Sequence, residues 1–250
     1  VDPNTNESTE AEAAFSAMDY RSGQVKVLVG GRDDSTPSTS NRAYYSDGFA
    51  LNVLRPIGST TKPLLVYSPG LESGALTLGS PANDTQITAD EVDIVKAFNI
   101  AGNVPYPRNV DYNYTGNTTI RKAITNSYNT VSMRSYYNLG DARQELAINY
   151  AEKFGLVLPR TADGSVNKQE FGASYVSLGN NFAYNKDGGN SLILAEAYGT
   201  FGNNGVKTDG ILYTQVTDSD GTVILDNTPK TEQIISPQNA FLIYDVMKDV

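Results

Sequence analysis

Two short segments of the chain carry side chains that could perform nucleophilic catalysis. In the first, Ser59 and Lys62 stand three residues apart, directly after Gly58 and at the start of an apolar run. Residues three apart lie on one face of a helix, so the lysine can take the serine proton if burial lowers its pKa. Free N–H groups at a helix start also favour a developing oxyanion. The spacing therefore fits Ser59 as a nucleophile with Lys62 as its base, and it equally fits two polar residues at the start of an ordinary helix.

The second segment holds Ser127 and Asn129, in the break between two expected helices. Both side chains can face a cleft there, where a hydroxyl can pass a proton to a leaving amine and a carboxamide can bind a peptide carbonyl and the lysine. Each motif is common by itself, as a capping serine or a turn asparagine. Ser165 and Lys168 repeat the first motif in a polar segment without apolar periodicity. We expect that copy to be a solvated loop.

Composition excludes several classes of function. The 250 residues include no Cys and no His, which excludes disulfides, thiolate metal sites and imidazole catalysis. A formal net charge of −9, with scattered basic residues, argues against nucleic acid as the main partner. No apolar run is long enough to span a membrane, and the first residues show no signal-peptide pattern. Neither a metal nor a cofactor is expected.

The pattern of apolar and turn residues predicts one helix-rich α+β domain with a small antiparallel sheet. Hairpins are expected over residues 12–30 and at Asp220-Gly221. A helix of three to four turns should begin at Ser59, where Pro63 is tolerated in the first turn. Further helices are expected from the Thr88–Glu91 capping box, near Thr118, at 129–138, from Asp141 to Gly155, at 190–205 and from Ser236, with loops over 31–54, 99–115 and 156–189.

Taken together and in order, the motifs resemble those of class A (bifunctional) penicillin-binding proteins. "AEAAFSAMDYRSGQVKVLVGG" resembles the hairpin that opens their transpeptidase domain, and "RPIGSTTKPLLVYSPGLESG" resembles the nucleophile segment. "TIRKAITNSYNTVSMRSYYNLG" is similar to the second-motif helix pair, and "ISPQNAFLIYDVMKDV" to a segment before the third motif. The resemblance covers residues 11–250, leaves 1–10 as a linker or tail, and implies the penicillin-binding/serine β-lactamase-like transpeptidase fold of the Gram-positive type.

The resemblance implies a serine D,D-transpeptidase that crosslinks peptidoglycan and is a target of β-lactams. Ser59 would attack the penultimate D-Ala of a stem peptide with Lys62 as general base. Ser127 and Asn129 would relay the proton and hold the donor peptide. Substrate contacts would come from Gly58, Thr61 and Tyr128. The full-length protein would act at the extracytoplasmic face of the membrane, with its anchor and glycosyltransferase domain outside this chain.

The third motif of the family, Lys-Thr-Gly, is absent from the sequence. Lys207-Thr208 is similar, but Asp209 stands where a glycine should let a substrate strand pass closely. We therefore expect the Lys-Thr-Gly strand, and with it the remainder of the transpeptidase domain, outside this chain. The isolated chain is expected to be inactive.

Three alternatives differ in testable ways. A serine β-lactamase-like hydrolase needs a glutamate that activates water, and Glu145 and Glu170 are the candidates. A non-catalytic homologue could act as a sensor or scaffold, but it would not need both motifs. A cell-wall glycan-binding module could use the Tyr- and Asn-rich loops at 99–115 and 178–190. Nitrocefin turnover would favour the first alternative and glycan binding without acylation the last.

Overall fold

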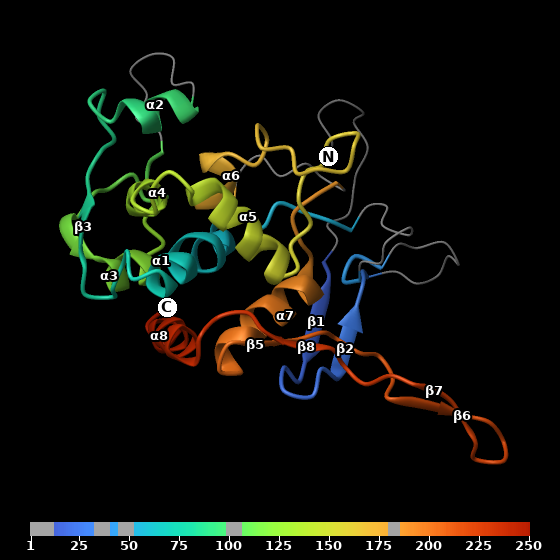
Figure 1. Cartoon of the computed structure of the whole chain (residues 1–250). Coiled ribbons are helices and arrows are strands. Elements are labelled where there is room, and N and C mark those ends of the chain that lie inside the picture. Colours follow the sequence, from blue (N-terminus) through green and yellow to red (C-terminus); the bar gives the residue numbers. More distant parts are fainter. Residues whose placement is uncertain (1–12, 33–40, 45–52, 99–106, 180–185) are drawn as a thin grey trace.

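A single long helical segment forms the centre of the fold, as seen in the computed structural model (Figure 1). The structure describes residues 13–32, 41–44, 53–98, 107–179 and 186–250. The segment begins as the 3-10 turn η1 (Gly58–Thr60), continues as the π-helix η2 (Pro63–Tyr67) and ends as α1 (Ser68–Glu72). The predicted helix is confirmed, whereas its π-helical turn was not expected.

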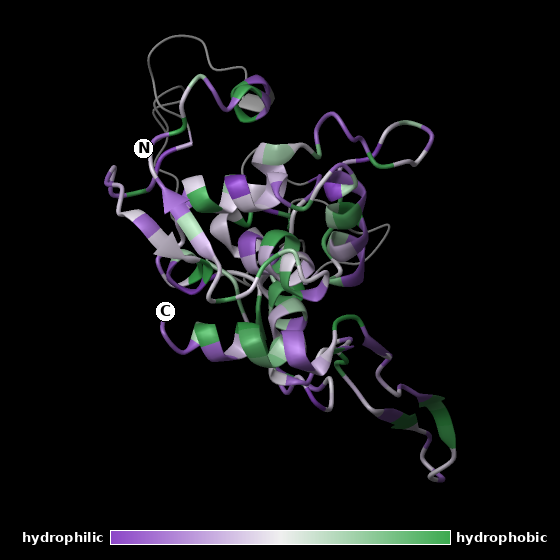
Figure 2. Ribbon diagram, turned by 60° about the vertical axis from the view of Figure 1, so that its left-hand side comes forward, coloured by the Kyte–Doolittle hydropathy of each residue, from purple (hydrophilic) through white to green (hydrophobic). Residues whose placement is uncertain are grey.

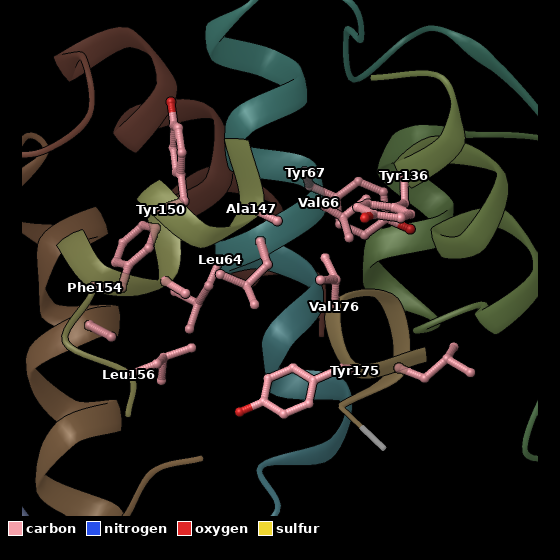
Figure 3. Close-up of a cluster of buried hydrophobic side chains, with 14 of the residues drawn as sticks. Leu64, Val66, Tyr67, Tyr136, Ala147, Tyr150, Phe154, Leu156, Tyr175 and Val176 are labelled. Atoms are coloured by element: carbon pink, nitrogen blue, oxygen red, sulfur yellow. The ribbon is translucent and has the colours of Figure 1, made fainter. Parts of the chain in front are cut away.

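Short helices surround this segment. The π-helix η2 contacts α4 (Asn129–Tyr137), α5 (Arg143–Lys153) and α6 (Ala173–Leu178), and α1 packs on α8 (Pro237–Met247). Figure 3 shows the resulting core, in which Leu64, Val66 and Tyr67 of η2 meet aromatic side chains of the neighbouring helices. Burying a large apolar side chain stabilises a fold by about 1.5–3 kcal/mol, so this packing holds the central segment in place.

Four pairs of short antiparallel strands complete the described part of the fold. The first pair, β1 (Phe15–Met18) with β2 (Val25–Val29), confirms the first hairpin, and Gly23 takes the left-handed conformation in its turn. The pair β5 (Val206–Thr208) and β8 (Thr231–Gln233) lies beside it. Both pairs contact α7 (Ser191–Gly202), so this helix separates the strands from the helical core.

The second hairpin is also confirmed. Its strands, β6 (Gln215–Thr217) and β7 (Val223–Asp226), project away from the remainder of the molecule (Figure 1). All of their residues are exposed. In the ribbon of Figure 2, the projecting hairpin carries a stretch in the green of hydrophobic residues.

The last pair, β3 (Pro81–Asp84) with β4 (Gly116–Thr119), was not predicted. Apart from Ala82, its residues are polar or turn-forming, so the two strands lack the alternation that indicates a strand. Helix α6 was not predicted either, because all six of its residues are buried and it has no polar face.

Two expected helix starts need correction. Ala142, not Asp141, is the N-cap of α5, although Gly155 lies just past its end in the left-handed conformation, as predicted. At the capping box, the Glu91 carboxylate accepts from the Thr88 N–H (3.0 Å), but α2 (Val92–Phe98) begins only after it.

The other caps agree with the predictions. Thr119, beside the expected position, caps α3 (Ile120–Thr125) by accepting from Lys122 N. Ser236 caps α8, with Pro237 in its first turn. No helix within the described ranges is long and apolar enough to cross a membrane. Much of the expected glycan-contact loops, residues 99–106 and 180–185, lies outside the described residues.

Candidate active site

Hydrogen bonds to neighbouring residues hold the turn at Ser59, and the serine side chain stays accessible. Gly58 takes a left-handed backbone (φ +57°), and a β-carbon there would meet nothing within 4 Å. The Thr60 hydroxyl donates to Ile57 O (2.6 Å), and the Tyr198 hydroxyl of α7 donates to Thr60 O (2.9 Å). Ser59 is exposed, and its hydroxyl makes no hydrogen bond with any residue that the structure describes. The serine hydroxyl is therefore free to meet a ligand.

Thr61 does not face the surface of this turn. Its side chain is fully buried, and its hydroxyl donates to the Gly58 carbonyl (3.1 Å). We assign Thr61 to support of the turn, in place of the expected substrate contact. Tyr128 is half-buried and packs partly against the hydrophobic core.

Lys62 is buried beside the second motif. Only 2% of its surface is exposed, and its Nζ donates to Ser127 O (2.7 Å), Ser127 Oγ (2.9 Å) and Asn129 Oδ1 (2.5 Å). Among the described residues, no carboxylate forms an ion pair with it. Burial lowers its pKa to about 7 because the charged ammonium loses its hydration. A substantial fraction of Lys62 is then neutral near pH 7 and can accept a proton.

The second motif lies in a tight connection between α3 and α4. Ser127 adopts the left-handed conformation (φ +55°), which is uncommon outside glycine. Backbone hydrogen bonds from Ser127 N to Ile124 O and from Tyr128 N to Ala123 O close the turn. This conformation aims both Ser127 oxygens at Lys62. The predicted break between two helices is confirmed, with α4 beginning at Asn129.

Asn129 is held by three contacts, two of its carboxamide and one of its backbone. Its Nδ2 donates to Arg108 O (2.7 Å), its backbone N–H donates to Asn109 Oδ1 (2.9 Å), and its Oδ1 faces Lys62. Asn109 donates in turn to the buried Asp84. Sequence reasoning missed Asn109 and Asp84, because each is separated from the motif in sequence and follows no recognisable pattern.

The other candidate lysines lie in different surroundings. Lys168 is exposed and forms an ion pair with Glu145, and Ser165 hydrogen-bonds to Asp163 in an exposed turn, as predicted for a solvated loop. Lys207 forms ion pairs with Glu196 (3.5 Å) and Asp209 at the β5 strand.

Comparison with known proteins gives the family of the chain. The family model "Penicillin binding protein transpeptidase domain" matches residues 13–250. Penicillin-binding protein 1A of Clostridium perfringens (strain 13) is 39% identical over 98% of this chain, which spans 34% of the length of that relative. Penicillin-binding protein 1A of Clostridium acetobutylicum is 36% identical over 96% of this chain and 27% of its own length.

Solved structures support the same fold. Penicillin-binding protein 1A from Haemophilus influenzae superposes with a TM-score of 0.68 at 20% identity, over 94% of this chain and 34% of that chain. The PonA1 protein from Mycobacterium tuberculosis, in complex with penicillin V, gives a TM-score of 0.68 at 19% identity, over 94% of this chain and 54% of that chain. With a family model that spans nearly its whole length, the chain belongs to the penicillin-binding protein transpeptidase domain family.

Proposed function

We propose that this chain carries the acyl-transfer centre of a peptidoglycan D,D-transpeptidase, with Ser59 as nucleophile and Lys62 as general base. The observation that carries the proposal is the contact of the buried Lys62 amine with Ser127 and Asn129, 65 and 67 residues further along the chain. Two motifs that are common by themselves are thus joined at one buried amine. The family assignment and the names of its relatives support the same reading.

Acylation would begin with attack of Ser59 Oγ on the carbonyl carbon of the penultimate D-Ala of a stem peptide, while neutral Lys62 takes the serine proton. The Ser59 backbone N–H lies at a helix start, where N–H groups lack helical partners and can stabilise the oxyanion. The C–N bond then breaks. A proton passes through the Ser127 hydroxyl to the amine of the leaving D-Ala, and an acyl-serine ester remains.

In the second half-reaction, an amine of a neighbouring stem peptide attacks the ester and loses its proton to the same relay. The new peptide bond is the crosslink, and Ser59 regains its hydroxyl. A β-lactam would acylate Ser59 by opening of its ring amide, and the ring nitrogen would receive the proton. The ligand would then stay on the serine.

The proposal treats residues 11–250 as part of the transpeptidase domain. The Lys-Thr-Gly strand and the remaining oxyanion contacts would come from chain outside this sequence, since the sequence spans 34% of its Clostridium perfringens relative. The proposed setting is the extracytoplasmic face of a Gram-positive-type membrane, and the other partners are stem peptides and β-lactams. The 250-residue chain alone would not be acylated efficiently.

The hydrolase alternative lacks a positioned base in the described part of the chain. Glu145 is exposed on α5 and pairs with Lys168, and Glu170 is exposed as well. Among the described residues, no carboxylate contacts Lys62.

Mass spectrometry of the full-length protein after penicillin treatment tests the assignment. We expect the adduct on the peptide that holds Ser59, and its loss in Ser59→Ala. Ser165→Ala is the matched control, because Ser165 belongs to the exposed copy of the motif and its loss should leave labelling unchanged. An adduct on another peptide, or full labelling of Ser59→Ala, would refute the proposal.

A further inference from the structure

A fully buried carboxylate, Asp84 at the end of β3, lies next to the candidate site without contacting Lys62. It accepts four hydrogen bonds. Its Oδ1 accepts from Thr130 Oγ1 (2.6 Å) and Asn109 Nδ2 (2.8 Å), and its Oδ2 accepts from Thr115 N (2.8 Å) and Thr115 Oγ1 (3.0 Å). The Asp84 side chain thus connects the end of β3 with the segment 109–115 and with the start of α4.

Two of these contacts lead to Asn129. Thr130 is the next residue in α4 and is itself fully buried. Asn109 receives the Asn129 backbone N–H on its Oδ1 (2.9 Å). Asp84 Oδ1 therefore binds both Thr130, which follows Asn129 in the chain, and Asn109, which accepts the backbone N–H of Asn129. The other oxygen holds Thr115, next to the start of β4, in place.

The start of α4 needs this support because it lacks a cap of its own. Tyr128 is the N-cap residue and makes no side-chain capping bond, although a capping bond commonly stabilises a helix start. The preceding left-handed Ser127 adds backbone strain. Asn109 satisfies one free N–H of the first turn, and the Asp84 charge lies near the positive end of the helix dipole.

Burial would raise the pKa of the Asp84 carboxyl, but the hydrogen bonds from Thr130, Thr115 and Asn109 outweigh burial and hold the pKa below its ordinary value. The group is a carboxylate at neutral pH and acts only as an acceptor. An asparagine at position 84 would place its NH₂ group where one of the Asp84 oxygens now accepts, so that N–H groups would face N–H or O–H donors.

We propose that Asp84 is a positioning residue for acyl transfer, which holds Asn129 against Lys62 through Thr130 and Asn109. The inference rests on the proposed function, because it assigns Asp84 a role at the same site. A loosened α4 start would move the Asn129 carboxamide away from the lysine amine and let Ser127 leave its left-handed turn. Misplacement of a positioning group by about 1 Å can cost on the order of 100-fold in rate.

The test uses the full-length protein and a fluorescent penicillin, with separate measurement of the binding constant and of the first-order acylation rate. Thr130→Val removes the hydroxyl at nearly constant volume, and Thr130→Ser retains it. We expect Thr130→Val to lower the acylation rate by about 10- to 100-fold with little change in binding. Thr130→Ser should restore most of the rate, and Asp84→Asn should resemble Thr130→Val.

Ser132→Ala is the matched control. Ser132 lies on the same helix, is fully buried and donates to Ser177 O (2.8 Å), so its loss removes an equivalent buried hydroxyl. We expect Ser132→Ala to lower the melting temperature as Thr130→Val does, but to keep the wild-type acylation rate. An equal loss of rate in Ser132→Ala would mean that general destabilisation causes the effect, and the proposal would be wrong.

The Asn129→Ala background provides a second, independent readout. If Asp84 and Thr130 act through Asn129, Thr130→Val should cause little further loss of rate in that background, while its effect on melting temperature persists. A folded Thr130→Val protein with the wild-type rate, or a full additional loss in Asn129→Ala, would overturn the inference. Ser59→Ala in the same assay separates the two claims, because labelling that survives it refutes the proposed function itself.

Discussion

The protonation of Lys62 should control the pH dependence of acylation. Burial lowers the pKa of Lys62 to about 7, so about half of the side chain is neutral at pH 7 and roughly a tenth at pH 6. An exposed lysine, with a pKa of about 10.4, would be neutral in only about one molecule in 2,500 at pH 7. Burial therefore raises the population of neutral Lys62 about a thousandfold at this pH.

The expected profile follows from these fractions. The acylation rate of the full-length protein should rise about tenfold between pH 5 and pH 6, bend near pH 7 and level off by pH 8. Stopped-flow acylation with a fluorescent penicillin measures this rate. Lys168→Met, which replaces the exposed lysine of the second Ser-x-x-Lys copy, should reproduce the wild-type profile.

The same pKa should appear in stability. A lysine with a lowered native pKa binds its proton more weakly in the folded protein than in the unfolded chain. The unfolded chain therefore holds more protons between pH 7 and about 10.4, and stability contributed at this position rises with pH over that window. Relative to Lys62→Met, the wild-type free energy of unfolding should increase by about 2 kcal/mol from pH 7 to pH 9.

A profile that stays flat from pH 6 to 9, or that rises only near pH 10, would refute the role of a desolvated Lys62 as base. A flat stability difference between wild type and Lys62→Met would refute the lowered pKa itself. The unfolding measurement contains no penicillin, so a pH dependence that appears in both measurements cannot come from the penicillin alone.

Three further predictions concern groups around the site. Gly179→Ala should lower the free energy of unfolding by more than about 1 kcal/mol and should also lower the acylation rate. Gly179 has φ +66°, and a β-carbon there would lie 1.9 Å from Gly58 O. A wild-type melting temperature would contradict this prediction. Tyr198→Phe removes the donor to Thr60 O (2.9 Å) and should cost about 1 kcal/mol with a few-fold loss of acylation rate, measured by thermal unfolding and penicillin labelling. Hydrogen bonds hold the pKa of Asp84 below its ordinary value, so its stabilising effect should be present above about pH 4 and be lost at lower pH. Asp84→Asn should therefore weaken the loss of stability at acid pH, and an unchanged pH dependence of unfolding in this variant would contradict the prediction.

Several elements with local signals were predicted well. Ser236 and Asn190 accept from backbone N–H groups three residues ahead, so each helix start is encoded within four residues. Gly23 similarly sets the first turn by its own backbone conformation. Such signals depend on no distant contact, and a single sequence can reveal them.

Elements that depend on distant partners were missed. The β3–β4 pair joins segments more than 30 residues apart, such as Ala82 with Thr118, and neither strand has an apolar face of its own. Helix α6 is buried all round, so no amphipathic period marks it. The same reason hides Asp84, which looks like a loop residue until its four donors are brought together.

The candidate site was predictable in part because Ser-x-x-Lys spacing on a helix that enters the core places the two side chains on one face. The same spacing leaves the serine exposed and buries the lysine. Ser59 lies in a 3-10 turn, where side chains three residues apart align and each residue rises about 2 Å. One turn after the exposed Ser59, the chain reaches Lys62, which is 2% exposed. The helix thus enters the core between the two residues, and the following π-turn of apolar residues keeps it there. Ser59 stays in contact with solvent while Lys62 loses water, and this difference in hydration lowers the lysine pKa far enough for the proposed role as a base near neutral pH.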